Sequence, residues 1–109
     1  MDMCFQEAID LYRDVVKRFE KIEGRKWAAE GAMIELSKQV GDLARCVMFQ
    51  ENYYAFPCDS DKNKKQIEDE LADIFGQLIR LADYYQIDLL HAHIEARKGE
   101  SAYLEQRGV

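Results

Sequence analysis

The chain has 109 residues, of which 48% are hydrophobic and 33% are charged, with six glycines and one proline. A chain this short forms one domain, here residues 1–109, and its composition excludes an intrinsically disordered protein. The net charge of −6 argues against a protein that binds nucleic acid through a basic surface.

The cysteines and the apolar segments suggest where the protein works. No apolar run approaches the roughly 18 residues of a membrane span, and no leader-like segment precedes Cys4. Cys4, Cys46 and Cys58 form neither a CxxC pair nor an even set. We therefore expect a cytoplasmic protein with reduced thiols and with neither a membrane nor a nucleic-acid partner.

Two amphipathic helices are predicted in the first half of the chain, because apolar residues recur there with a period of about 3.6 residues. The first helix should end before Gly24, and the second should follow "GRKW" and run to about Gln50. The apolar stripes of the two helices contain Phe5, Ile9, Tyr12, Val16 and Phe19, and then Met33, Leu36, Val40, Leu43 and Val47.

Two more helices are predicted after the loop "ENYYAFPCDSDKNK", which carries the single proline. The third should run from near Lys64 to about Tyr85, and the fourth should begin at Asp88 as N-cap. Its buried side should be Ile87, Leu90 and Ile94. The segment from about residue 99 either extends this helix, docks on a partner or frays. The expected fold is all-α, a four-helix bundle-like arrangement completed by oligomerisation.

The second and third helices carry polar side chains along the border of their apolar arcs. These residues are Gln39, Asp42 and Cys46 on one helix and Glu70, Asp73 and Gln77 on the other. Antiparallel packing through the apolar arcs would bring both borders to one groove, and its oxygen atoms are ligands that Mg²⁺ or Mn²⁺ prefers. The alternative is a solvated boundary of charges, which is common on amphipathic helices.

Two segments resemble a known family. The stretch "WAAEGAMIELSKQVGDLARCVM" and the stretch "EDELADIFGQLIRLADYYQIDLLHA" are similar to MazG-type, all-α nucleoside triphosphate pyrophosphohydrolases, over roughly residues 27–92. The family signature is ExxE on one helix and ExxD on the next. Glu70 and Asp73 match ExxD, Asp42 replaces the second Glu of ExxE, and Gln39 stands where the first Glu is expected.

The resemblance implies a Mg²⁺-dependent hydrolase, with Mn²⁺ as a possible substitute, that converts a nucleoside triphosphate to its monophosphate and pyrophosphate. It assigns Glu70 and Asp73 as the main metal ligands and Asp42 as a third ligand or the base that activates water. Catalysis would rest on Asp42 and Glu70. Gln39 would be a weakened ligand or a water-positioning amide, and Glu35 either supplies the missing charge or is a surface residue.

The resemblance also implies substrate contacts and an assembly. Arg97 and Lys98 are the candidates for binding phosphate, although basic residues also stabilise a helix C-terminus. Trp27 is favoured as the wall against which the base stacks, with Tyr53, Tyr54 and Phe56 as alternatives. The family implies a homodimer or homotetramer. A catalytically degenerate bundle that acts as a nucleotide-binding or protein-interaction module is the second interpretation.

Overall fold

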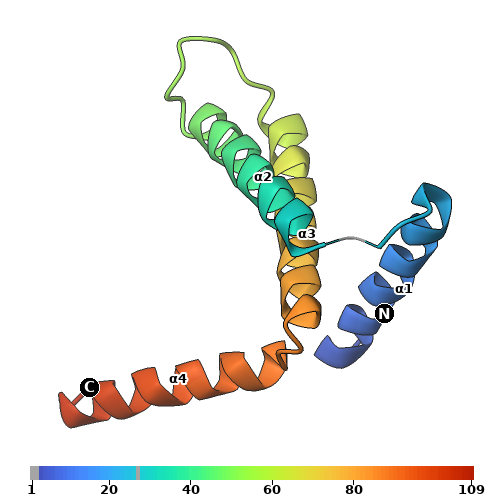
Figure 1. The fold of residues 1–109 in the computed structure, drawn as a ribbon. Helices are drawn as coiled ribbons and strands as arrows, with labels where there is room; N and C mark the ends of the chain where they lie inside the picture. Colours follow the sequence, from blue (N-terminus) through green and yellow to red (C-terminus); the bar gives the residue numbers. More distant parts are fainter. Residues whose placement is uncertain (1–2, 27) are drawn as a thin grey trace.

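The structure, a computed structural model, describes residues 3–26 and 28–109, and this part of the chain contains four α-helices and no strand. The helices are α1 (Phe5–Glu23), α2 (Ala29–Gln50), α3 (Ser60–Tyr84) and α4 (Leu89–Gln106) (Figure 1). The all-α prediction is confirmed. Across the two described ranges, no helix has the length and apolar character that crossing a membrane requires.

The helix ends follow local capping signals. α1 ends at Gly24, whose φ of 73° is a left-handed conformation that glycine adopts without strain. α3 begins at Ser60, earlier than predicted, because the Asp59 side chain accepts a hydrogen bond from the backbone N–H of Lys62 at 3.2 Å. Asp88 caps α4 as predicted, and α4 continues through Gly99, so the C-terminal segment extends the helix.

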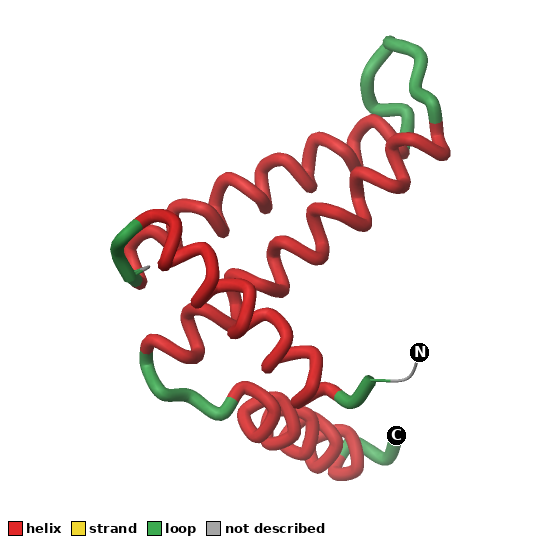
Figure 2. Tube along the Cα trace, turned by 90° about the vertical axis from the view of Figure 1, so that its right-hand side faces the viewer, coloured by secondary structure: helices red, strands yellow, loops and turns green. Residues whose placement is uncertain are grey.

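α2 and α3 lie side by side and antiparallel, joined by the loop of residues 51–59 (Figures 1 and 2). Near the loop the Asn63 side-chain N–H donates to the Cys46 carbonyl at 2.7 Å, and the Gln50 amide donates to Ser60 Oγ at 2.7 Å. These bonds fix which residues of the two helices stand at the same level. We call the line of contact between α2 and α3 the seam.

The seam repeats every seven residues, because seven residues are about two helical turns and return to the same face. Moving seven back from Cys46 and seven forward from Asn63 reaches Gln39 and Glu70. Another such step reaches Ala32 and Gln77, which are both buried. The layers between them pair half-buried apolar side chains, Leu43 with Ile67 and Leu36 with Ile74.

α1 packs on the C-terminal half of α3 through a small set of contacts. Ile9 and Ile79 are 3% and 1% exposed and form the apolar centre of this contact. Beside them the Tyr12 ring lies on Gly76, where an added Cβ would come within 2.7 Å of the ring. Arg13 and Asp83 form a two-pronged ion pair, with Nε to Oδ2 at 2.9 Å and Nη2 to Oδ1 at 2.7 Å.

α4 extends away from the other helices (Figure 1), and none of its residues is buried. Ile87 and Ile94 are 49% and 40% exposed. The prediction that these two side chains are buried is therefore wrong for a single chain. Leu90 is half-buried. The radius of gyration is 17.6 Å, against about 13 Å for a compact chain of about this length. A single chain therefore leaves α4 outside the helix packing.

Candidate metal and nucleotide site

A polar layer interrupts the seam where Gln39 of α2 and Glu70 of α3 stand at the same level. Glu70 is only 8% exposed, and its Oε1 accepts a hydrogen bond from Gln66 at 3.0 Å. The Oε1 atom of Gln39 is buried and has no hydrogen-bond partner among the described residues. Apolar layers of the seam lie above and below this polar layer. A buried acceptor without a donor costs free energy there, because burial removes its hydrogen bonds to water and no donor replaces them. A cation or a donor group would satisfy it.

A cavity of about 370 Å³ opens beside Glu70, between α2 and the first half of α3. It is lined by Asp42, Arg45, Cys46, Phe49, Asn63, Gln66 and Glu70. The structure thus brings Asp42 and Glu70, the two predicted catalytic residues, to the same cavity. Burial raises the pKa of the Cys46 thiol, and the charges of Glu70 and Asp42 raise it further, against the opposing effect of Arg45.

Asp73 and Glu35 lie elsewhere. Asp73 is exposed and absent from the cavity lining. The charge of Asp73 acts on Tyr12 of α1, whose pKa is raised by burial, lowered by Arg80 and raised by Asp73. Glu35 lines a different cavity of about 430 Å³, together with Arg25 and Arg80. Glu35 is therefore not placed to replace the charge that Gln39 lacks.

The described part of the chain contains no group of three His, Cys, Asp or Glu residues arranged to hold a metal ion. The oxygen atoms gathered here come from two carboxylates, Asp42 and Glu70, and from the amide of Gln39. Such a set suits Mg²⁺, which is commonly held by one or two carboxylates and completed by waters and substrate phosphates. It is too sparse for an ion bound by protein ligands alone.

The two flanks of the α2–α3 pair differ in chemistry. In an antiparallel pair, residues that follow a seam position by one lie on the same side on both helices. On that side are Met33, Val40, Val47, Leu71 and Leu78, all at least 41% exposed, which we call the apolar flank. The opposite side, the polar flank, carries Glu35, Asp42, Phe49, Gln66, Asp73 and Arg80.

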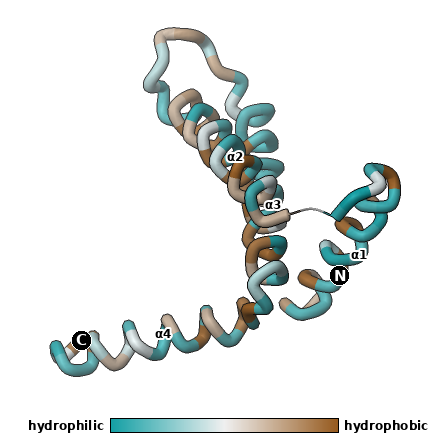
Figure 3. Tube along the Cα trace, in the orientation of Figure 1, coloured by the Kyte–Doolittle hydropathy of each residue, from teal (hydrophilic) through white to brown (hydrophobic). Residues whose placement is uncertain are grey.

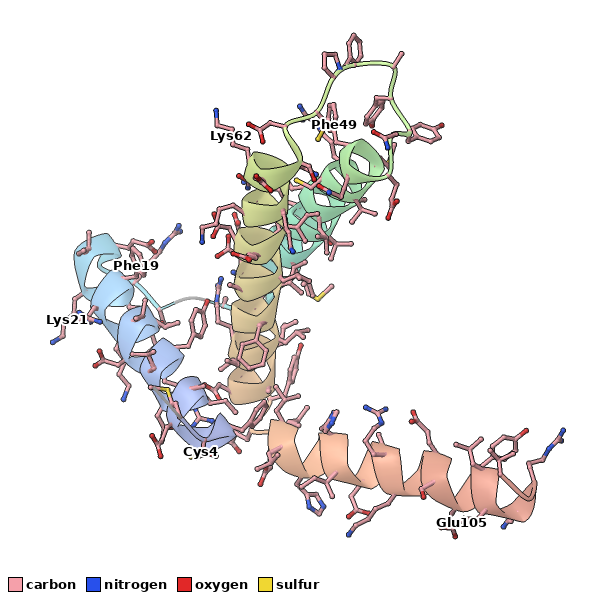
Figure 4. All side chains as sticks on the ribbon, turned by 180° about the vertical axis from the view of Figure 1, so that it is seen from behind. Cys4, Phe19, Lys21, Phe49, Lys62 and Glu105 are labelled. Carbon is pink, nitrogen blue, oxygen red and sulfur yellow. The ribbon has the colours of Figure 1, made fainter. Side chains whose placement is uncertain are left out.

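The predicted substrate residues are only partly placed. Trp27 lies outside the described residues. Arg97 pairs with Glu100 at 2.8 Å and Lys98 with Glu95 at 3.6 Å, both within the outlying α4, so neither meets the cavity in one chain. Figure 4 shows all side chains with Phe49 labelled at the loop end of the pair.

The aromatic side chains near the loop form a cluster at the end of the cavity. Tyr54 stacks at a tilt on Phe49 with ring centroids 4.6 Å apart, and Tyr53 meets Tyr54 edge-on at 5.4 Å. Phe56 is 71% exposed. Sequence reasoning named the two tyrosines but missed Phe49, which lines the cavity. The signal was available, because Phe49 follows Asp42 by seven residues and so shares its flank.

Comparison with known proteins gives no relative for this chain. No protein-family model matches it, and neither a curated protein nor a solved structure is significantly similar to it.

Proposed function

We propose that this protein is a MazG-type nucleotide pyrophosphohydrolase, which uses Mg²⁺ or Mn²⁺ to convert a nucleoside triphosphate to its monophosphate and pyrophosphate. The observation that carries the proposal is the polar layer of the seam. A nearly buried carboxylate, Glu70, and a buried amide oxygen without a partner, that of Gln39, stand at the same level of the seam, and Glu70 lines a cavity together with Asp42. A divalent cation would satisfy both oxygens and offset the charge of Asp42.

In this proposal each residue has a separate task. Glu70 and Gln39 would hold the cation from the two sides of the seam, and Asp42 would be a third ligand or accept a proton from the attacking water. The cation, when bound, would offset the charge of the triphosphate and lower the pKa of that water. Phe49 and the ring of Tyr54 offer an apolar surface for the base.

One observation favours the second interpretation, a degenerate module that binds nucleotide without cleaving it. The described residues provide no group of three His, Cys, Asp or Glu side chains arranged to hold a metal ion, and Asp73 does not line the cavity of Asp42 and Glu70. Gln39 further reduces the electrostatic attraction for a cation, since an amide oxygen is neutral. Binding could survive this loss where turnover does not.

We also propose that the protein is a homo-oligomer, at least a dimer, that covers the apolar flank. One chain leaves Val40, Val47, Leu71 and Leu78 between 41% and 52% exposed on the same side of the α2–α3 pair. Exposed strips of this kind on a small domain mark a protein contact. Leu71→Glu should shift the sedimentation of the protein to that of a monomer, whereas Leu11→Glu, at a 56% exposed site on α1, should not.

The assay that tests the activity measures pyrophosphate release from a panel of canonical and modified nucleoside triphosphates with Mg²⁺ or Mn²⁺. We expect release with at least one of them, a loss of about 100-fold or more in Glu70→Gln, and no change in Glu68→Gln. Glu68 is the matched control because it lies on the same helix and is exposed. Turnover that survives in Glu70→Gln would contradict the assignment of the site.

When turnover is absent, metal titration by calorimetry tests whether the degenerate module still binds metal at this site. Gln39→Glu should bind Mn²⁺ more tightly because it adds a charge beside Glu70. Asp73→Asn tests whether Asp73 turns into the site when metal and nucleotide bind. If it does, this variant should bind Mn²⁺ more weakly than the natural chain. Thermal stabilisation by nucleotide plus metal without turnover supports the degenerate module. The absence of both effects would reject both functions.

A further inference from the structure

Two of the three free cysteines lie at the junction of α2 and α3. Cys46 is near the end of α2 and Cys58 directly precedes Asp59, the N-cap of α3, and both are half-buried. Cys4, at the start of α1, is exposed and belongs to another part of the fold. The sequence spacing alone gives no reason to pair Cys46 with Cys58, because they are not a CxxC motif.

Hydrogen bonds hold the segments of these two cysteines together. Asn63 donates to the Cys46 carbonyl at 2.7 Å and to Gln50 Oε1 at 3.0 Å, and Gln50 in turn donates to Ser60 Oγ at 2.7 Å. Gln50 stands one turn after Cys46, and Ser60 follows Cys58 by two residues. Cys58 is also among the groups that act on the pKa of Cys46, after burial, Glu70, Asp42 and Arg45.

The loop between the two cysteines is anchored to α2 in its first part and exposed further along. Its first part is anchored to α2 by the ring contacts of Tyr53 and Tyr54 and by a bond from Tyr54 Oη to Met48 Sδ at 3.9 Å. Its second part passes through Phe56, which is 71% exposed and takes part in none of the ring contacts found within the described ranges. Cys58 follows this exposed part of the loop, and the Gln50–Ser60 bond keeps its end of the loop beside α2. A disulfide requires such a short separation of the two Cα atoms.

We propose that Cys46 and Cys58 are a reversible modification site that forms an intramolecular disulfide by exchange with a small-molecule disulfide such as oxidised glutathione. The Cys58 thiolate attacks one glutathione sulfur, which gives a mixed disulfide and releases one glutathione thiolate. The Cys46 thiolate then attacks the Cys58 sulfur and releases the second. Two protein thiols are oxidised, one disulfide is reduced to two glutathione molecules, and these take up the two thiol protons.

The disulfide would change the cavity, because Cys46 is one of its lining residues. The Cys46 sulfur would turn toward Cys58, and the disulfide would link the end of the loop to α2 at the edge of the cavity. The inference does not depend on nucleotide chemistry, since thiol exchange needs only the two cysteines and the oxidant.

Peptide mapping of the full-length chain in a glutathione redox buffer tests the proposal. Trypsin cuts after Arg45 and Lys62, so both cysteines fall in one peptide, "CVMFQENYYAFPCDSDK". The expected product is this peptide two hydrogen atoms lighter and resistant to alkylation. Chymotrypsin, which cuts after Tyr53 and Tyr54, should leave its halves linked. Cys4→Ser should behave as the natural chain does, and Cys58→Ser should lose the product.

The decisive measurement compares folded and unfolded protein and needs no variant. If the fold holds the two thiols together, the equilibrium constant for the disulfide should be about 10-fold larger in buffer than in denaturant. Separate glutathione adducts on Cys46 and Cys58, or a constant that is no larger in the folded chain, would overturn the proposal.

Discussion

α3 and α4 begin alike and differ in what covers them. Each starts at an Asp whose side chain accepts a hydrogen bond from the backbone N–H three residues on, at 3.2 Å for Asp59 and 3.0 Å for Asp88. α3 is then covered by α2 on one side and by α1 near its end, whereas no residue of α4 is buried. The comparison teaches that capping and helix propensity set where a helix begins, while the periodicity of its apolar side chains decides whether a partner can cover it.

The hydropathy of the two helices explains the difference. In Figure 3 the colours along α4 are mixed, whereas brown patches gather where α3 meets its neighbours. Apolar residues of α3 recur at every second turn along the seam, at Ile67, Ile74 and Leu81. In α4, Leu90 and Ile94 are followed at the next positions of the same face by Arg97 and Ser101. A stripe that stops after two residues gives a neighbouring helix little to bury against.

The largest expected effect contrasts a core residue of α3 with an apolar residue of α4. Ile79→Ala should lower the free energy of unfolding by about 2–5 kcal/mol, because it leaves a cavity where the side chain is 1% exposed. Ile94→Ala, at a 40% exposed site, should change it by less than about 0.5 kcal/mol. Urea unfolding measures both. An equal cost for the two variants would show that another copy of the chain buries α4.

The second contrast uses a glycine in each helix. Gly76→Ala should destabilise the protein by about 1–3 kcal/mol, because the new Cβ would lie 2.7 Å from the Tyr12 ring and push α1 away. Gly99→Ala has no atom within 4 Å of the new Cβ, so the higher helix propensity of alanine should raise the helicity of α4.

Far-UV circular dichroism and thermal unfolding would report both glycine variants. Restoring space with Tyr12→Ala in the Gly76→Ala background should recover part of the loss by removing the clash, which a double-mutant cycle would show as coupling. Additive costs would mean that the ring does not rest on Gly76.

Most helix positions could be predicted from the sequence, because the signals for them are local. The 3.6-residue period, Gly24 and Asp88 marked the helices and two of their ends correctly. α3 begins at Ser60 with Asp59 as its N-cap, inside the segment that the polar composition predicts to be a loop. There the capping bond outweighs the polar composition of the first turn.

The candidate site was predicted less completely, for a geometric reason. The apolar arc of each helix is wider than the strip that one neighbour covers, and a helical wheel does not say which part of the arc is used. In the structure Gln39 and Glu70 lie in the seam itself, while Val40, which belongs to the predicted apolar stripe, is 49% exposed, and Leu71 is 52% exposed. Asp73 acts on the pKa of Tyr12, which is 61 positions earlier, and local periodicity cannot find such a neighbour.

The third contrast removes the cap of each helix. Asp59→Ala should cost about 1 kcal/mol of global stability, because α3 cannot fray without loosening the seam. Asp88→Ala should leave global stability almost unchanged and instead speed amide hydrogen exchange in the first turn of α4. Hydrogen exchange followed by mass spectrometry measures both. If Asp59→Ala speeds amide hydrogen exchange only in the first turn of α3, then α3 frays as α4 does, and the expected difference between the two helices is contradicted.

The smallest expected effect is a pH dependence of the free energy of unfolding, which arises from the burial of Tyr12 against α3. Burial raises the pKa of Tyr12 above its ordinary value of 10.0, so the folded chain holds this proton more tightly than the unfolded chain does. The contribution of the protonated Tyr12 side chain to the free energy of unfolding is therefore intact below about pH 10. It is lost as the pH rises through the raised pKa of Tyr12. Tyr12→Phe cannot ionise, and its free energy of unfolding should fall less steeply between about pH 9 and pH 11. Tyr103→Phe, at a 58% exposed site on α4, should keep the slope of the natural chain. If the three slopes agree, Tyr12 is not buried against α3, and α1 is as weakly held as α4.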